Sequence, residues 1–294
     1  MKTEYLERAN RIATDNVSSA QQVLKDTLGL LYDFSMENCE GESFVRDLKS
    51  LATNLSNAQS QMSALSNICR LVVSASDKAK PEAMCSYLDS LLRKVGEASL
   101  RTAEHASKLV ADAGVYATLS QSEFVIRLFE LAAEQGKVAT IYVMESRPLF
   151  EGRQSARALK KMGHRPILVS DASIGAFVTF IDSAFVGADA ILSDGTLINK
   201  IGSYPLAAAC AIAKKKFYAV TSVLKYDSEK SANTFINKEE SAHEIFANPE
   251  LEVRNFYFDK VDGGLVTAVI TEIGLVSPFS EIGRLNAAMR EMYG

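Results

Sequence analysis

The sequence has few of the residues that build metal and redox sites. Its four cysteines include no C-x-x-C pair, so the spacing indicates neither a zinc knuckle, nor a redox motif, nor a disulfide scaffold. None of the three histidines stands at the H-x-x-x-H spacing of a helical metal site. We therefore expect buried thiols, no metal ion and no cofactor.

Long apolar runs and an excess of basic charge are also missing. No stretch approaches the roughly 20 apolar residues of a membrane span, and the start MKTEYLERANRIA is charged, unlike a signal peptide. The net charge is −4, so no general basic field indicates nucleic-acid binding. The composition predicts a soluble cytoplasmic protein with no membrane partner and no direct nucleic-acid signal.

The pattern of apolar residues divides the chain into two halves. Its 294 residues exceed what one hydrophobic core usually needs. Residues 1–110 place apolar side chains at three-to-four spacing, which predicts about five helices, one beginning near Pro81 because proline is tolerated in a first helical turn. We predict a helical domain over residues 1–110 and a Rossmann-like α/β domain over residues 111–294.

From Gly114 onward, short apolar β-rich runs alternate with amphipathic stretches. The expected strands are GVYATL, KVATIYVM, RPILVS, ADAILS and KFYAVTS, and the expected helices cover residues 122–135, 153–162, 173–185 and 204–214. This alternation predicts a doubly wound parallel sheet with helices on both faces. Ligands bind such sheets at the carboxyl ends of the strands, near the point where the strand order reverses.

Polar side chains follow the expected strands at the point where each strand ends. The candidate ligand-binding residues are Thr118, Ser120, Ser122, Glu145, Arg147, Asp171, Asp194, Asn199 and Lys200. Hydroxyls, carboxylates, an amide and cations at one edge suit a polyol that carries an anionic group. Structural roles are the alternative: Ser120 and Glu123 fit a capping box for the next helix, and Asp171 fits a helix cap.

Two long segments carry a family resemblance. YVMESRPLFEGRQSARALKKMGHRPILVSDASIGAFV and GADAILSDGTLINKIGSYPLAAACA resemble the superfamily that joins the regulatory (α, β, δ) subunits of eukaryotic initiation factor 2B to the isomerases of methylthioribose 1-phosphate and ribose 1,5-bisphosphate. DNVSSAQQVLKDTLGLL and NAQSQMSALSNICRLV extend the resemblance more weakly into the helical half. It implies a Rossmann-like fold, a sugar phosphate or nucleotide as ligand, a homodimer, and a possible partner among the translation initiation factors.

The chain departs from the isomerases where they carry their proton-transfer residues. Their cysteine in T-H-C-x-S and their aspartate in N-G-D-x-x-N-K match Ser120 and Thr196. Neither hydroxyl has a pKa near neutrality, and each lost proton carrier typically costs about 10²- to 10⁴-fold in rate. The arginine of the helical-half segment matches Gln59, and the R-G-A turn near the isomerase N-terminus matches residues 17–20, so two phosphate-binding arginines are missing as well.

These departures leave three hypotheses. The first is a non-catalytic regulatory-type subunit, dimeric through its α/β domain, that binds a sugar phosphate or nucleotide. The polar residues that it retains are Glu145, Arg147, Asp171, Asn199 and Lys200. The second is an isomerase in which Ser120 or Asp194, through a shifted turn, moves the protons.

The third hypothesis is a structural assembly subunit without a ligand. In such a subunit the crevice would be filled, for example by Leu119 or Phe150, and Arg147 would pair with Glu145 or another carboxylate inside it to support the fold. The sequence alone names no ligand.

Overall fold

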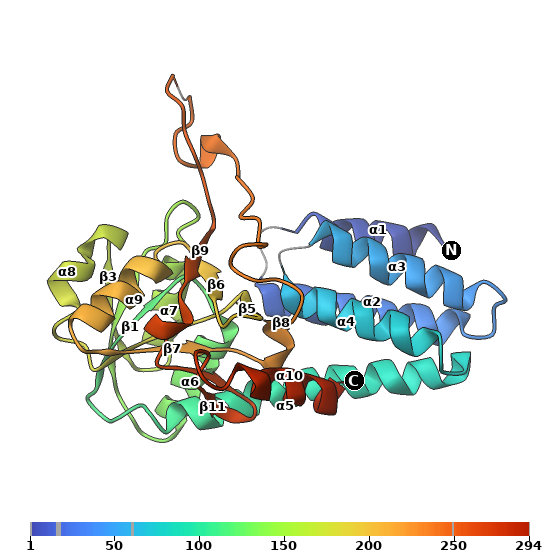
Figure 1. Cartoon of the computed structure of the whole chain (residues 1–294), viewed down its shortest axis with the longest axis horizontal. Coiled ribbons are helices and arrows are strands. Elements are labelled where there is room, and N and C mark those ends of the chain that lie inside the picture. Colours follow the sequence, from blue (N-terminus) through green and yellow to red (C-terminus); the bar gives the residue numbers. More distant parts are fainter. Residues whose placement is uncertain (1, 16–18, 60–61, 249, 294) are drawn as a thin grey trace.

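The first third of the chain is helical, as predicted (Figure 1). The computed structural model describes residues 2–15, 19–59, 62–248 and 250–293. The helices are α1 (Thr3–Ala13), α2 (Ala20–Asn38), α3 (Phe44–Ala58), α4 (Ser63–Ser76) and α5 (Pro81–Ser107). Pro81 begins α5, as expected. Because α5 packs against α2 at one end and against the α/β half at the other, it belongs to both halves, and the domain boundary near residue 110 stays a prediction.

A seven-stranded sheet forms the centre of the α/β half. Its strands are β1 (Val115–Leu119), β2 (Thr140–Met144), β3 (Arg165–Val169), β4 (Ser183–Val186), β7 (Lys216–Val220), β10 (Ala268–Thr271) and β11 (Gly274–Val276). Their order is β11-β10-β7-β4-β1-β2-β3, and all pairs are parallel except β10 with β11. The chain winds outward from β1 in one direction and from β4 in the other, so the strand order reverses between these two strands. The predicted doubly wound sheet is confirmed.

Helices cover both faces of this sheet. They are α6 (Glu123–Glu134) and α7 (Gly152–Lys161) on one face, and α8 (Ile174–Phe177) and α9 (Ser203–Ile212) on the other. Successive residues of β1 point to opposite faces. Tyr116 packs in a cluster with Phe129 of α6, whereas Ala117 belongs to the core that contains Phe177 and Leu206. Helix α10 (Ile282–Tyr293) lies beside β11. Strand β9 (Phe258–Val261) precedes β10 along the chain.

Two expectations for the α/β half were wrong. The expected helix over residues 173–185 is only a short helical turn, and β4 follows it in the middle of the sheet. A central parallel strand is buried on both faces, so its apolar run carries no period that separates it from a buried helix. The segment ADAILS does form a strand, β5 (Ala190–Leu192), but in a second sheet of order β8-β5-β6-β9 with β6 (Leu197–Lys200) and β8 (Tyr226–Asp227).

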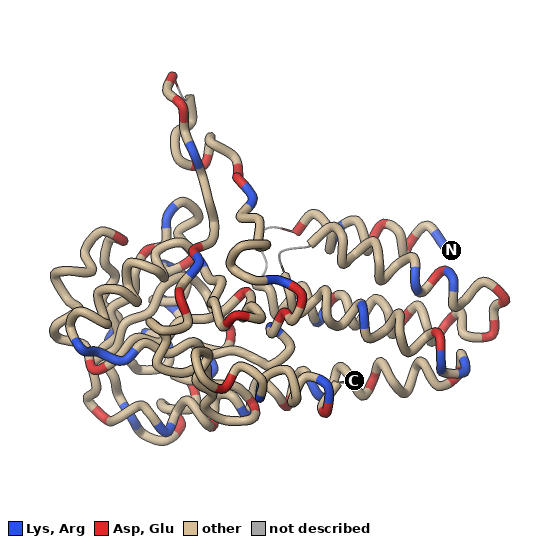
Figure 2. Tube along the Cα trace, viewed as in Figure 1, with Lys and Arg blue, Asp and Glu red and all other residues tan. Residues whose placement is uncertain are grey.

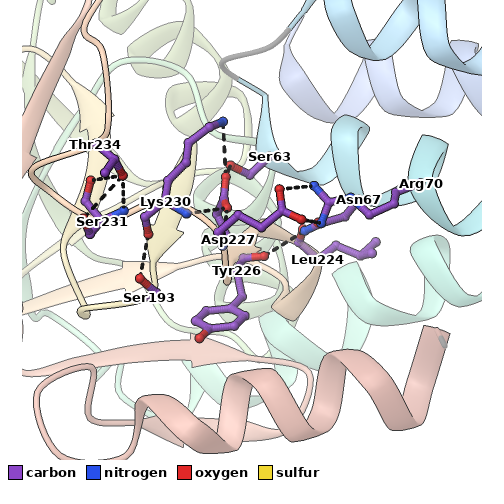
Figure 3. Close-up of polar contacts among 11 residues, drawn as sticks. Ser63, Asn67, Arg70, Ser193, Leu224, Tyr226, Asp227, Lys230, Ser231 and Thr234 are labelled. Atoms are coloured by element: carbon purple, nitrogen blue, oxygen red, sulfur yellow. Dashed lines mark hydrogen bonds and ion pairs between the residues drawn. The ribbon is translucent and has the colours of Figure 1, made fainter.

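Buried polar contacts join α4 to the segment that leads into β8 (Figure 3). Asn67 donates from its amide nitrogen to the carbonyl oxygens of Leu224 and Tyr226, both at 2.8 Å. Ser63 donates to a carboxylate oxygen of Asp227 at 3.2 Å. Because Lys225 lies between the two carbonyls that Asn67 binds, α4 fixes the backbone on both sides of this lysine.

Across the described residues, no helix is long and apolar enough to cross a bilayer.

Candidate functional site

A cavity of about 400 Å³ opens at the point where the strand order reverses. Residues 119–124 line it from the end of β1, and residues 187–189 line it from the end of β4. Residues 199–200 of β6 and residues 257–258 at the start of β9 close other sides, and α2 and α3 contribute residues 20–21 and 58. The cavity therefore lies where the doubly wound topology predicts a ligand site.

Four of the predicted site residues meet in this cavity: Ser120, Ser122, Asn199 and Lys200. Ser122 caps α6 by accepting a hydrogen bond from the Val125 N–H, so the expected capping box beginning at Ser120 was wrong. Asn199 is buried and donates to the Ser203 hydroxyl at 2.8 Å. These residues therefore bring hydroxyl, amide and ammonium groups to one hollow.

Lys200 is held by an acidic and an aromatic neighbour. Its ammonium lies 2.6 Å from a carboxylate oxygen of Glu151 and 4.5 Å from the centroid of the Tyr257 ring. The other oxygen of Glu151 is buried, and none of the described residues gives it a hydrogen-bond donor. An ammonium has three N–H donors, so Lys200 keeps donors for a ligand, and Glu151 keeps an acceptor oxygen for a ligand hydroxyl.

A second acidic and a second basic side chain, Asp189 and Lys225, also line the cavity. Lys225 is 7% exposed and donates to the Ala188 carbonyl oxygen. Burial lowers the pKa of Lys225, against the opposing effect of the nearby Asp189 carboxylate. Burial raises the pKa of Asp189, against the effects of Lys225 and Lys200. Desolvation thus disfavours the charge on both partners.

The other predicted site residues do not line the cavity. Thr118 is buried within β1. Glu145 forms an ion pair with Arg153 at 2.8 Å, so the suggested pairing with Arg147 was wrong. Arg147 is exposed, with its guanidinium on the Ile245 carbonyl at 3.4 Å.

Two predicted carboxylates hold backbone turns. Asp171 accepts hydrogen bonds from the N–H groups of Ser146 and Arg147 at 2.8 and 2.7 Å. It therefore joins two loops and does not cap the helix that follows it. Asp194 accepts from the N–H groups of Thr196 and Ala232 at 3.1 and 2.8 Å. Both carboxylates stand outside the lining of the cavity.

The positions that distinguish the isomerases also have a structural account. Thr196 is buried beside the turn of Asp194 and does not line the cavity. Gln59 does line it, and its side-chain nitrogen lies within 3.3 Å of the carbonyl oxygens of residues 12, 13 and 15. The Gln59 amide therefore holds the end of α1 in place, whereas an arginine at this position would offer hydrogen-bond donors to a phosphate. Residues 17 and 18 of the R-G-A position lie outside the described residues.

The crevice is not filled as the third hypothesis requires. Leu119 forms part of its wall, and Phe150 stands outside its lining, with the Arg153 guanidinium 3.8 Å from its ring centroid. Sequence reasoning missed Asp189, Lys225 and Tyr257. Lys225 follows the strand KFYAVTS, so the rule of strand ends already contained the signal for this residue.

The described residues include no group of three or more His, Cys, Asp or Glu side chains placed to hold a metal ion. The cavity instead offers two buried or half-buried ammonium groups, hydroxyls and a free carboxylate oxygen. This combination fits an organic ligand with both anionic and hydroxyl groups, since lysines bind phosphate and carboxylates accept from hydroxyls.

Comparisons with known proteins point to one family. The family model described as "Initiation factor 2 subunit family" matches residues 16–278. A putative translation initiation factor eIF-2B subunit 2-like protein of Pyrococcus abyssi is 28% identical over 82% of this chain and 84% of its own length. The ribose 1,5-bisphosphate isomerase of Archaeoglobus fulgidus is 26% identical over 94% and 90%. The crystal structure of a translation initiation factor eIF-2B from Pyrococcus horikoshii OT3 superposes with a TM-score of 0.85 at 26% identity, covering 95% of this chain and 98% of that one.

Proposed function

The chain belongs to the initiation factor 2 subunit family, and on this basis we propose that it is a non-catalytic, regulatory-type member that binds a sugar phosphate or nucleotide. The observation that carries the proposal is the cavity at the strand-order reversal. It gathers Lys200, Lys225 and Asn199 but has only a hydroxyl, Ser120, at the thiol position, and Thr196 lies outside its lining. Such a site can bind an anionic polyol without supplying the proton carriers of an isomerase.

The contacts suggest how such a ligand lies. Its phosphate would meet the ammonium groups of Lys200 and Lys225, and a hydroxyl would donate to the free oxygen of Glu151. The first turn of α6 also borders the cavity, and N–H groups at a helix N-terminus favour anions. A phosphate oxygen would take the place of the Glu151 carboxylate as the ion-pair partner of Lys200.

Thermal unfolding with a panel of sugar phosphates, bisphosphates and nucleoside monophosphates tests the proposal. A ligand at about 100 times its Kd stabilises the folded state by about 2.7 kcal/mol. We expect a saturable shift for at least one compound, lost in Lys200→Ala and kept in Lys161→Ala, which removes an exposed lysine at the end of α7. No shift with any compound at millimolar concentration would contradict the proposal.

A second candidate, an aldose-ketose isomerase of a phosphorylated ribose, is favoured by Asp189 and Lys225. Burial that moves the pKa values of an acid and a base toward neutrality suits proton transfer, and here burial raises the pKa of Asp189 and lowers that of Lys225. The test is turnover of ribose 1,5-bisphosphate or methylthioribose 1-phosphate. Turnover abolished by Asp189→Asn would establish this candidate, and no turnover by the wild type would remove it.

We further propose that the protein acts as a homodimer formed through its α/β half, in the cytoplasm, next to a translation initiation factor. The support is the family and its eIF-2B relatives. Co-sedimentation of the purified chain with purified initiation factor 2 tests the partner. A chain that sediments independently at micromolar concentrations of both proteins would contradict it.

A further inference from the structure

Lys225 enters the cavity from a short turn whose backbone is held from within. The 3₁₀ turn Val223–Lys225 leads directly into β8, and residues 222–225 are called the lysine turn here. The N–H groups of Leu224 and Lys225 donate to the hydroxyl and the carbonyl oxygen of Ser222, at 3.2 and 3.0 Å. The position of Ser222 therefore sets the point from which the Lys225 side chain reaches the cavity.

One buried carboxyl group holds the first two residues of the lysine turn. Glu272 directly follows β10 and is 4% exposed. Its Oε1 accepts a hydrogen bond from the Ser222 hydroxyl at 2.7 Å, and its Oε2 accepts one from the Val223 N–H at 3.0 Å. Strand β10 is the neighbour of β7 in the sheet, so the carboxyl group reaches the turn from the adjacent strand end. Because a buried polar group that loses its hydrogen-bond partner costs free energy, the carboxyl group and the turn hold each other in place.

Helix α10 supplies a third donor to this carboxyl group. Tyr293 is fully buried, and its hydroxyl donates to Glu272 Oε1 at 3.2 Å. The buried side of the helix also carries Leu285, whereas Arg284 and Arg290 are exposed. Both signs of charge occur along α10 (Figure 2). The helix thus keeps its charged side in solvent and turns the Tyr293 hydroxyl toward the strand ends.

The same helix also reaches the residue on the other side of Lys225. Helix α10 packs against β8 as well as against the lysine turn. Tyr226, the first residue of β8, is buried, and Figure 3 shows its ring directed toward α10. On the opposite side, Asn67 of α4 binds the carbonyl oxygens that flank Lys225. The backbone around Lys225 is therefore held through its carbonyls by α4 and through its N–H groups by the Glu272 network.

We propose that Glu272 and Tyr293 are positioning residues for the ligand site, although neither of them lines the cavity. By holding the lysine turn, they direct the Lys225 ammonium at the anionic group of the bound ligand. A phenylalanine ring would fill the core as well as Tyr293 does, so the part played by the hydroxyl is its contact with the carboxyl group. This inference rests on the anionic ligand proposed above, and it adds α10 to the parts of the chain on which the ligand site depends.

Hydrogen exchange of the full chain, without any ligand, tests the hold on the lysine turn. Tyr293→Phe keeps the ring and removes one donor to Glu272, and Ser222→Ala removes the link between that carboxyl group and the turn. We expect the amides of residues 223–225 to exchange at least about tenfold faster in both variants. The amides of β2 should keep their wild-type rates, since β2 lies on the far side of β1 from the turn.

Tyr116→Phe is the matched control for the loss of a buried tyrosine hydroxyl. The Tyr116 hydroxyl is buried under α6 and accepts a hydrogen bond from the Ala111 N–H at 2.8 Å. Removing it costs a comparable contact without touching the lysine turn, so the amides of residues 223–225 should exchange as in the wild type. Circular dichroism establishes that each variant is folded.

A double-mutant cycle with inorganic phosphate tests the effect on the ligand site. Binding is measured as the saturable shift of the thermal midpoint with phosphate concentration. Tyr293→Phe should weaken phosphate binding by about three- to tenfold in the wild-type background. In the Lys225→Met background the same change should weaken it by less than about twofold, because the hydroxyl acts only through the lysine. Tyr116→Phe should bind phosphate as the wild type does.

The outcomes separate this inference from the proposed function. Unchanged exchange at residues 223–225 in both Tyr293→Phe and Ser222→Ala would overturn the positioning role and leave the ligand proposal standing. Equal losses of phosphate binding with and without Lys225 would do the same, because the hydroxyl would then act by another route. A wild type that binds neither phosphate nor any compound of the panel would overturn both proposals.

Discussion

Asn67→Ala offers the most direct test of how the helical half supports the ligand site. The side chain is 7% exposed, and its amide nitrogen donates to two carbonyl oxygens at 2.8 Å each. Alanine would leave both oxygens without this donor in a buried place, at a cost of about 1 kcal/mol or more for each. We therefore expect the free energy of unfolding to fall by about 2 kcal/mol.

Urea denaturation monitored by circular dichroism measures this loss. A shift of the unfolding midpoint, without a change in the slope of the free energy against urea concentration, would show that the stability itself has fallen. The matched control is Arg70→Ala, one turn further along α4, whose ion pair with Glu229 at 3.0 Å is exposed. Exposed pairs typically contribute less than about 1 kcal/mol. Because Lys225 lies between the two carbonyls, Asn67→Ala should also weaken the binding of whichever ligand stabilises the wild type.

The reasoning would be refuted by an Asn67→Ala protein that unfolds within about 0.5 kcal/mol of the wild type, the range of an ordinary surface substitution. An equal loss in Arg70→Ala would refute it too, because the effect would then belong to α4 as a whole and not to the two buried carbonyls.

Three further predictions concern the buried groups of the α/β half. Gly152→Ala would place a Cβ 1.9 Å from the carbonyl oxygen at the end of β2, so we expect a loss above about 3 kcal/mol or no folded protein in a thermal melt, whereas Gly175→Ala, with open space around its Cβ, should change little. Lys225→Met should cost about 2 kcal/mol in urea denaturation because it removes the cation with the largest favourable effect on the Asp189 carboxylate. Adding Asp189→Asn should recover most of that loss, and additive losses would contradict the coupling of the two side chains. Burial raises the pKa of Glu272, so the folded state binds the proton of this carboxyl more tightly than the unfolded state does. The stability that this proton contributes is greatest below the ordinary pKa of a glutamate and is lost as the pH rises through the raised pKa of the folded state. The stability of the wild type relative to Glu272→Gln should therefore fall as the pH rises above about 4, near the ordinary pKa of a glutamate, and a difference that does not vary with pH would contradict it.

Local patterns in the sequence were enough to predict most elements and the position of the cavity. Helical spacing predicts α1 to α5, and the alternation of strands and helices predicts the doubly wound sheet, because each pattern reflects which side of an element is buried. The rule of strand ends correctly placed Ser120 at the cavity, since carboxyl ends of parallel strands share one edge. Asn199 and Lys200 reach the same cavity from β6 of the second sheet, a strand that the sequence analysis did not predict. The absence of the isomerase thiol and carboxylate at Ser120 and Thr196 could likewise be recognised from the sequence, because the chemistry of a missing thiol or carboxylate does not depend on the fold.

Only the tertiary structure decided which polar residues face the cavity. Asp171 and Asp194 follow strands and Lys200 ends one, yet the two carboxylates bind backbone N–H groups, and a sequence carries no sign of which way such a side chain turns. The same holds for β4, whose apolar run is compatible with a helix until neighbouring strands bury both its faces. Asn67 and Tyr226, separated by 159 positions, meet only when α4 packs against the start of β8. Contacts between such distant residues depend on the packing of whole elements, which is a property of the folded chain and not of any local pattern.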